Sequence, residues 1–229
     1  MPRKHDTAPE AAAEREAARL HAMLEFERQA AENGFLRVAG VDEAGRGPLA
    51  GPLAAAAVVL AFPVAGLDDS KKLTEARREE LYETLIAGPH AIGVGLVEAG
   101  ELDRIGLQPA NYAAMARAVA ALSPPPDFLL VDGFALPGVV QPVLRLVKGD
   151  RRSLSIAAAS IIAKVTRDRR MKRMDEQWPQ YGFGRHKGYG TADHLEALRR
   201  HGPCPEHRRS FAPVGGAPEA GLWPAPPEE

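Results

Sequence analysis

Short apolar runs with turn-forming residues at their ends predict the strands of this protein. Three such runs are LAAAAVVL (53–60), HAIGVGLVEA (90–99) and PVLRLV (142–147), and each has a length typical of a strand. A fourth, FLRVAGVDEAGRG, starts at Phe35 and enters a Gly-rich turn. It lies close enough in sequence to 53–60 to pair with it as a hairpin. DFLLVD (127–132) is short and continuously apolar, which is typical of a buried parallel strand.

Longer segments with helical periodicity alternate with these strands. Residues 10–33 are rich in Ala, Glu and Arg, and Asn33-Gly34 ends the predicted helix. We predict further helices over about 73–87, 108–122 and 191–201, and a long one ending near Trp178. Asp68 to Ser70 are candidate caps for the helix at 73–87, and Ser153 or Ser155 for the long helix.

This order of elements predicts an α/β fold in which a mixed sheet is flanked by helices. Residues 1–35 form a predicted N-terminal helical appendage, and 36–214 the main domain with a C-terminal helical portion. Residues 215–229 are rich in Gly, Pro and Ala, so we expect a disordered tail. The sequence has no internal repeat.

Composition narrows the class of protein. The chain has 229 residues, of which 45% are hydrophobic, enough for a sizeable core. Cys204 is the only cysteine, so a disulfide framework is excluded. No run approaches the roughly 18 apolar residues of a membrane span, and the charged first twenty residues do not resemble a secretory signal. We therefore expect a soluble, cytoplasmic protein without a membrane partner.

The net charge of −1 conceals an uneven distribution. Between Arg145 and Arg209 there are sixteen Lys and Arg residues against seven Asp and Glu, so the rest of the chain is acidic. A basic portion on an acidic chain indicates a polyanionic partner such as nucleic acid. A solvated charged surface is the alternative.

Acidic residues follow three of the predicted strands. Asp42 and Glu43 come after the first strand, Asp132 closes FLLVD, and Asp150 follows the strand at 142–147. Sites in α/β sheets gather at the carboxyl ends of strands. Each acid alone could be a turn residue or a surface ion pair. Asp42 and Glu43 would also point to opposite faces of a regular strand, so they share a site only if the backbone bends or one acts through water.

Taken together, the four carboxylates predict a site for hard divalent cations such as Mg²⁺ or Mn²⁺. His186, His194, His201, His207 and Cys204 are scattered without zinc spacing. Neither a nucleophile motif of the G-x-S-x-G type nor a P-loop is present.

Two glycine-containing segments could contact a ligand through their backbone. Gly45-Arg46-Gly47 exposes backbone groups and adds a planar donor suited to phosphate. HKGYGT (186–191) supplies a charge from Lys187 and a ring from Tyr189, which suits sugars and bases. A simple turn, or a tyrosine that anchors a loop, would explain the same residues.

Seven ordered blocks resemble the ribonuclease HII family over about residues 38–214. They are GVDEAGRGPLAGP, DDSKKLTEARREEL, LLVDG, VKGD, IAAASIIAKVTRD, GFGRHKGYGT and HRRSFAPV. The resemblance, not the periodicity, implies a ribonuclease H-like fold. It implies an endonuclease that cuts the RNA strand of RNA–DNA hybrids and nicks duplex DNA on the 5′ side of embedded ribonucleotides. Products would carry 5′-phosphate and 3′-hydroxyl ends, a role in ribonucleotide removal.

The resemblance also assigns roles to residues. Asp42, Glu43, Asp132 and Asp150 match the family's catalytic carboxylates and would hold two Mg²⁺ or Mn²⁺ ions. Asp168 is a rival for the fourth acid, although its Arg-rich helix favours ion pairing. Residues matching the family's contacts to the ribonucleotide 2′-hydroxyl are Gly45, Arg46, Gly47 and Tyr189, and plausible phosphate contacts are Lys71, Lys72 and Lys187.

The resemblance implies a monomer acting on hybrids and on ribonucleotide-containing duplex DNA. Two alternatives remain open. One is another ribonuclease H-like DNA nuclease, such as a junction resolvase, and the other is a non-catalytic protein that binds hybrids.

Overall fold

The protein is built around a mixed five-stranded sheet, as seen in a computed structural model that describes residues 8–216. The strand order is β3-β2-β1-β4-β5. The strands are β1 (Val38–Ala44), β2 (Leu53–Val59), β3 (Ala91–Val97), β4 (Phe128–Asp132) and β5 (Val143–Leu146).

The pairing of the strands confirms the predicted hairpin. β1 runs antiparallel to β2, and β2 antiparallel to β3, whereas β1, β4 and β5 are parallel to one another. Because β1 and β4 are parallel neighbours in register at Val41 and Val131, their carboxyl ends lie side by side. The predicted α/β class with a mixed sheet is confirmed.

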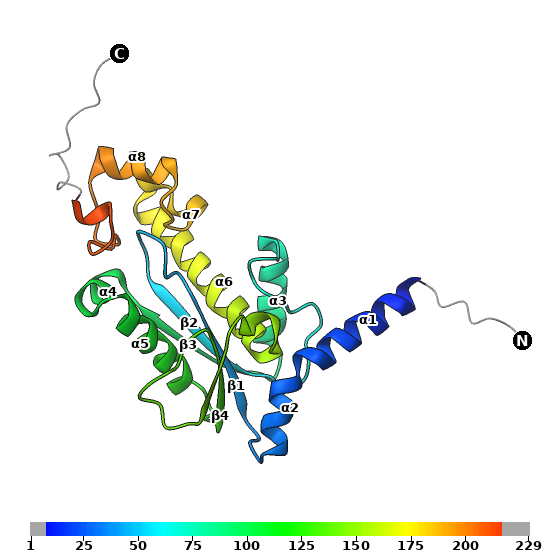
Figure 1. Ribbon diagram of the computed structural model, residues 1–229. Helices are drawn as coiled ribbons and strands as arrows, with labels where there is room; N and C mark the ends of the chain where they lie inside the picture. The colour runs from blue at the N-terminus through cyan, green and yellow to red at the C-terminus, as the bar shows by residue number, and fades with distance from the viewer. Residues whose placement is uncertain (1–7, 217–229) are drawn as a thin grey trace, which may run out of the picture.

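Helices cover both faces of the sheet. α6 (Leu154–Gln177) and α3 (Glu75–Ala87) pack on one face, and α5 (Leu107–Ala120) with the short α4 (Ala99–Ile105) lies on the other (Figure 1). The almost uniformly apolar sequence of β2 follows from its position between these two layers of helices. Leu53 and Ala57 belong to the core beneath α5, and Ala56 and Val58 to the core beneath α6, so neither face of the strand meets water.

A close approach between α6 and β1 depends on a glycine. A Cβ atom built on Gly40 would lie 2.1 Å from the backbone carbon of Ser155, a distance no side chain tolerates. The start of α6 therefore rests directly on β1. This contact brings the polar residues of α6 beside the end of β1.

The C-terminal portion packs beyond the far end of α6 and is visible at the top of Figure 1. It contains η2 (Pro179–Tyr181), α7 (Phe183–His186), α8 (Ala192–His201) and η3 (Val214–Gly216). Its core includes Met171, Met174, Tyr181 and Phe183. A β-bridge between Ala50 and His207 joins it to the β1–β2 connection.

The N-terminal segment forms two helices instead of the single helix predicted over 10–33. α1 (Ala8–Met23) and α2 (Glu25–Glu32) are separated at Leu24, and α1 extends away from the sheet (Figure 1). The change of direction lets Met23 join the core beneath α6 while Ala30 packs with residues of β1 and β4. Arg19 ties α1 to the body by donating to the Leu67 carbonyl at 2.8 Å.

Local signals placed most helix ends correctly and one cap wrongly. Ser153 caps α6 as predicted, since its Oγ accepts from the Ile156 amide at 3.2 Å. The cap of α3 is Thr74, not Asp68 to Ser70, because those residues precede the helix by a full turn. α4 was not predicted, and it starts where the strand expected to reach residue 99 has already ended at Val97.

Two predictions concern the ends of the chain. Residues 217–229 of the predicted tail lie outside the described residues, and Val214–Gly216 form the 3₁₀ helix η3. No helix among residues 8–216 is long and apolar enough to cross a membrane.

Candidate active site

A cleft of about 300 Å³ lies at the carboxyl ends of β1 and β4. It collects residues from β1, the following glycine loop, β4, α6 and the loop before α8. The lining residues are Asp42, Glu43, Ala44, Gly45, Arg46, Gly47, Ser70, Lys71, Asp132, Ser160, Lys164, Arg167 and Tyr189. Eight of the eleven site residues predicted from the sequence are among them.

Asp42 and Glu43 both line the cleft although they are neighbours on β1. Asp42 lies on the α6 side, close to Ser160, and its Oδ1 accepts from the Glu43 amide at 2.7 Å. The strand ends at Ala44, and Gly45 turns the chain with a φ of +96°. The cleft crosses this open end of the sheet, so side chains from both faces of the strand reach it. Asp42 and Glu43 can therefore share one site although neighbouring residues on a strand point to opposite faces.

Burial and mutual repulsion disfavour the charged forms of these two acids. Burial, then the charges of Glu43 and Asp132, raise the pKa of Asp42 well above its usual range. Burial also raises the pKa of Glu43 to about 7, with Asp132 adding to the rise and Arg46 and Lys71 opposing it. Carboxyl groups in such a setting are stabilised as carboxylates by a nearby cation.

Asp132 and Asp150 come from successive parallel strands. Asp132 ends β4, and its Oδ1 accepts from the Gly149 amide at 2.6 Å. Asp150 lies in η1 (Gly149–Arg151), the turn after β5, and is buried. It does not line the cleft, but its Oδ2 is 3.8 Å from the Nζ of Lys71, which does. Burial and the charges of Asp69 and Asp132 raise the pKa of Asp150.

The acids suit a hard cation in their chemistry. The Oε2 atom of Glu43 is buried and accepts no hydrogen bond from any residue in the described range. Such an atom is costly unless a cation or donor reaches it. As the side chains stand, no three His, Cys, Asp or Glu residues within 8–216 form a group that could already hold a metal ion. The oxygen donors are therefore gathered at one place without forming a closed set of ligands.

The glycine loop and Tyr189 face each other across the cleft. A Cβ built on Gly47 would lie 3.9 Å from Cε1 of the Tyr189 ring, and Tyr189 is 47% exposed. The guanidinium of Arg46 lies over the Phe134 ring at 4.4 Å and donates to Gln108 at 3.2 Å. Its Nη1 is buried and makes no hydrogen bond to the described residues, so the chain leaves this donor without an acceptor.

The three predicted lysines differ in position. Lys71 lines the cleft. Lys72 instead pairs with Asp68 at 3.0 Å, and the Lys187 ammonium donates to the Gly184 carbonyl. Neither Lys72 nor Lys187 lines the cleft.

Sequence reasoning missed a polar stripe on α6. Ser160, Lys164 and Arg167 have the i, i+4, i+7 spacing of one helix face and all three line the cleft. Polar residues at this spacing in a helix that is otherwise buried are the signal that could have revealed them. Asp168 has a different partner, since its buried carboxylate forms an ion pair with the partly exposed Lys164 at 2.6 Å.

Asp69 was also missed as a neighbour of the acids. It is only 1% exposed, and Arg151 donates to its Oδ2 at 2.8 Å. Burial opposes ionisation of Asp69, but hydrogen bonds from the Lys71 amide and Arg151 outweigh it and lower the pKa. Its sequence position inside a predicted cap concealed this role.

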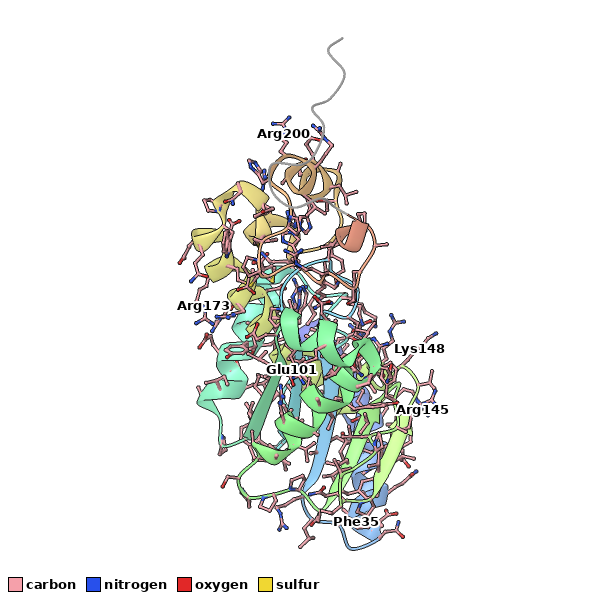
Figure 2. The ribbon with its side chains drawn as sticks, turned by 90° about the vertical axis from the view of Figure 1, so that its left-hand side faces the viewer. Phe35, Glu101, Arg145, Lys148, Arg173 and Arg200 are labelled. Carbon is pink, nitrogen blue, oxygen red and sulfur yellow. The ribbon has the colours of Figure 1, made fainter. Side chains whose placement is uncertain are left out.

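Basic residues between Arg145 and Arg209 lie on separate parts of the molecule. Figure 2 shows Arg145 and Lys148 together at one edge, Arg173 on the opposite side and Arg200 at the far end. Only Arg145 and Lys148 among these labelled residues come from β5 and its following turn, next to Asp150. These four labelled basic residues therefore do not form one patch.

Comparison with known proteins decides which family assembles its residues in this way. A family model described as Ribonuclease HII matches residues 39–214. The chain belongs to the ribonuclease HII family. It is thus a ribonuclease H, a hydrolase with endonuclease activity. The match covers every predicted site residue.

Relatives of this ribonuclease HII family member agree with the assignment. A Ribonuclease HII from Geobacillus kaustophilus (strain HTA426) is 56% identical over 210 residues, covering 88% of this chain and 80% of the relative. The crystal structure of the ribonuclease H2 from Pyrococcus horikoshii OT3 is similar with a TM-score of 0.66 and 28% identity, covering 80% of this chain and 97% of that one.

A more distant structure shares the fold. Bst-RNase HIII in complex with Mn²⁺ has a TM-score of 0.59 at 21% identity, covering 88% of this chain and 72% of that one. The ribonuclease H-like fold implied by the sequence blocks is thereby confirmed.

Proposed function

We propose that this ribonuclease H cuts the RNA strand of RNA–DNA hybrids and nicks duplex DNA on the 5′ side of an embedded ribonucleotide. One observation carries the proposal. Asp42, Glu43 and Asp132 share a single cleft with the Gly45–Gly47 loop and Tyr189. A group that hydrolyses a phosphodiester and a surface that contacts the adjacent sugar are then within reach of the same nucleotide.

The acids would hold two divalent cations, Mg²⁺ or Mn²⁺. Asp42, Glu43 and Asp132 supply the central oxygens, and Asp150 the fourth carboxylate. When bound, the cations would supply an activated water for in-line attack and charge stabilisation of the leaving 3′-oxygen. The raised pKa values of Asp42, Glu43 and Asp150 support this role, because cations favour the ionised form of acids that otherwise repel one another.

Specificity for ribonucleotides would come from the other wall of the cleft. The 2′-hydroxyl is the group that distinguishes RNA from DNA at one nucleotide. Gly45 is buried, and Arg208 holds the carbonyls of Gly45 and Arg46. Gly47 is exposed and Tyr189 places its ring beside it, so the backbone of Gly47 can approach the sugar. A deoxyribose would leave these polar groups unpaired, which disfavours cutting of DNA alone.

Positive charge would hold the backbone of the duplex without reading its sequence. Lys71 lies in the cleft itself, 3.8 Å from Asp150. Lys72 and Lys187 point to protein partners in this structure, so we assign them a weaker contribution than Lys71. Such contacts make affinity depend on salt but not on base sequence.

A single assay tests the proposal. The full-length protein is incubated with Mg²⁺ and three end-labelled duplexes of one sequence: all DNA, DNA with one ribonucleotide, and an RNA–DNA hybrid. We expect cleavage of the second and third only, with products ending in 3′-hydroxyl and 5′-phosphate, and the nick on the 5′ side of the ribonucleotide.

The same assay separates the alternatives. Cleavage of the all-DNA duplex at a comparable rate would indicate a DNA nuclease of the resolvase type. Binding of the hybrid without cleavage of any substrate, at any concentration of Mg²⁺ or Mn²⁺, would indicate a non-catalytic binder. Either result would contradict the proposal.

A further inference from the structure

A buried row of polar side chains ends on the backbone of Tyr189. Nδ1 of His194 lies 2.9 Å from the Tyr189 carbonyl oxygen, and Nε2 of His194 lies 3.0 Å from Nε2 of His207. Nδ1 of His207 lies 3.1 Å from the Cys204 amide nitrogen and 3.2 Å from its Sγ. His194 is fully buried and His207 is 2% exposed.

The partners of these atoms fix one arrangement of protons. A carbonyl oxygen only accepts, so Nδ1 of His194 carries the proton and its Nε2 is an acceptor. Nε2 of His207 must then be the donor to His194, and Nδ1 of His207 accepts from the Cys204 amide. Every ring nitrogen is satisfied with both rings neutral. Burial lowers the pKa of His194 to about 4 and that of His207 to about 3, which agrees with neutral rings.

Aromatic packing holds this row in place. His186 stacks on His194 with ring centroids 4.4 Å apart, and Phe183 meets His194 edge-on at 5.5 Å. His186 also accepts the Tyr189 amide on its carbonyl at 3.0 Å. Histidines thus hold both the amide and the carbonyl of Tyr189, while the ring itself is left half-exposed at the cleft.

The segment that carries His207 also holds the opposite wall of the cleft. Arg208 is fully buried and donates to the carbonyls of Gly45 at 2.6 Å, Arg46 at 3.1 Å and Gly51 at 3.0 Å. Adjacent residues on one segment therefore position both the glycine loop and Tyr189. The separation of the two walls depends on this segment.

We propose that the Cys204–His207–His194 row is a positioning device that sets Tyr189 against Gly47 and so determines recognition of the ribonucleotide. The inference deepens the proposed function and rests on it. His194 and His207 touch neither substrate nor cation in this role; they act through the backbone of Tyr189. This role requires both imidazole rings to be neutral. If either ring carried a proton on both nitrogens, one of its N–H groups would point at another donor instead of an acceptor.

The test uses two substitutions, each of which keeps one of the two hydrogen-bonding groups of His194. His194→Asn retains a donor where Nδ1 meets the Tyr189 carbonyl, and His194→Gln retains an acceptor where Nε2 meets His207. On duplex DNA with one ribonucleotide we expect kcat/KM to stay within about threefold for Asn and to fall about 10- to 30-fold for Gln. His201→Gln, at an exposed histidine of α8, is the matched control and should equal the unmodified protein.

A double-mutant cycle distinguishes positioning from simple loss of structure. If His194 acts through Tyr189, the variant with both His194→Gln and Tyr189→Ala should be no slower than Tyr189→Ala alone. Multiplied effects, or equal losses for Asn and Gln, would overturn the inference. All assays are run below the midpoint of thermal unfolding of each variant.

A second pair covers the case in which His194→Gln is unfolded at every assay temperature. His207→Gln retains the donor toward His194 and should equal the unmodified protein, whereas His207→Asn breaks the same contact as His194→Asn and should lower kcat/KM by a similar factor, about threefold. A larger loss for His207→Gln than for His207→Asn would overturn the inference. If Tyr189→Ala alone leaves the kinetics unchanged, Tyr189 does not read the ribonucleotide and the device has no target. The unmodified protein, assayed alongside, reports separately whether the proposed hydrolysis occurs.

Discussion

Two regions of the site differ in how their buried charges are satisfied: an acid wall of Asp42, Glu43 and Asp132, and an arginine wall of Arg167 and Arg208. On the strand ends, Asp42, Glu43 and Asp132 lie together, and the Oε2 atom of Glu43 has no donor among the described residues. On the other side, Arg167 and Arg208 are at most 1% exposed, yet each donates three hydrogen bonds to backbone carbonyls.

The buried arginines find their hydrogen-bond partners within the chain, whereas the buried acids include an oxygen atom whose partner a ligand could supply. The arginines donate to carbonyls of the connection between β1 and β2 and of Lys187, so the chain itself supplies the partners of these buried charges. Burial lowers the pKa of Arg208 to about 9, and the side chain still carries its charge at neutral pH. Burial and mutual repulsion disfavour the ionised acids, and a bound cation would stabilise them. We therefore expect substitutions of the arginines to lower stability and substitutions of the acids to lower activity.

The largest effect is expected from breaking the acid wall at its centre. Asp132→Asn keeps an oxygen that can accept from the Gly149 amide but removes a negative charge. We expect cleavage to fall by a factor of about 10³ or more, while binding of the hybrid changes less than about threefold. Gel-shift and single-turnover assays measure the two quantities. Asp193→Asn, at an exposed residue of α8, is the control, and Mg²⁺-dependent turnover by the Asp132 variant would refute the assignment.

The next largest effect decides whether Asp150 or Asp168 is the fourth carboxylate. Asp150→Asn should lower cleavage by about 100-fold because the fourth carboxylate is lost. Asp168→Asn should leave the rate of the folded protein within about tenfold, since Asp168 serves as the partner of Lys164. Both are measured at saturating Mg²⁺ after a check of thermal unfolding. If the Asp168 variant alone is inactive, the fourth acid has been misassigned.

A smaller effect is expected from breaking the arginine wall. Arg208→Lys keeps the charge but supplies one ammonium where a planar group now meets three carbonyls. We expect the free energy of unfolding to fall by about 2–4 kcal/mol, as read from urea denaturation. Arg209→Lys, its exposed neighbour, is the matched control. A loss no larger than that of the control would mean that these hydrogen bonds contribute little.

The smallest effect is a shift of cation affinity with pH. The pKa of Glu43 is raised to about 7, so below that pH a cation must displace a proton before it binds. The concentration of Mg²⁺ that half-saturates the site should rise about tenfold as the pH falls from about 7.5 to about 6. Calorimetric titration measures it, and Glu43→Gln should weaken the dependence. A pH-independent affinity would show that Glu43 is already ionised without the cation.

The sequence by itself determined the sheet, the order of its main elements and the position of the acids along the chain. Apolar runs and turn residues are local signals, so the β1–β2 hairpin, β4 and the cap at Ser153 were predictable. The seven blocks further implied the family, which the match over residues 39–214 shows. Local signals were less reliable where competing caps stood close together, as at Thr74, or where burial redirected a helix, as at Leu24.

Only the tertiary structure decided which residues share the cleft. Packing of α6 on Gly40 brought Ser160 beside Asp42, and the open strand end allowed Asp42 and Glu43 to face one space. Contacts between distant segments placed Lys71 beside Asp150 and Arg208 against Gly45. Side-chain direction depends on neighbours far away in sequence. Periodicity records whether a residue is buried, but it does not record which residue lies against it.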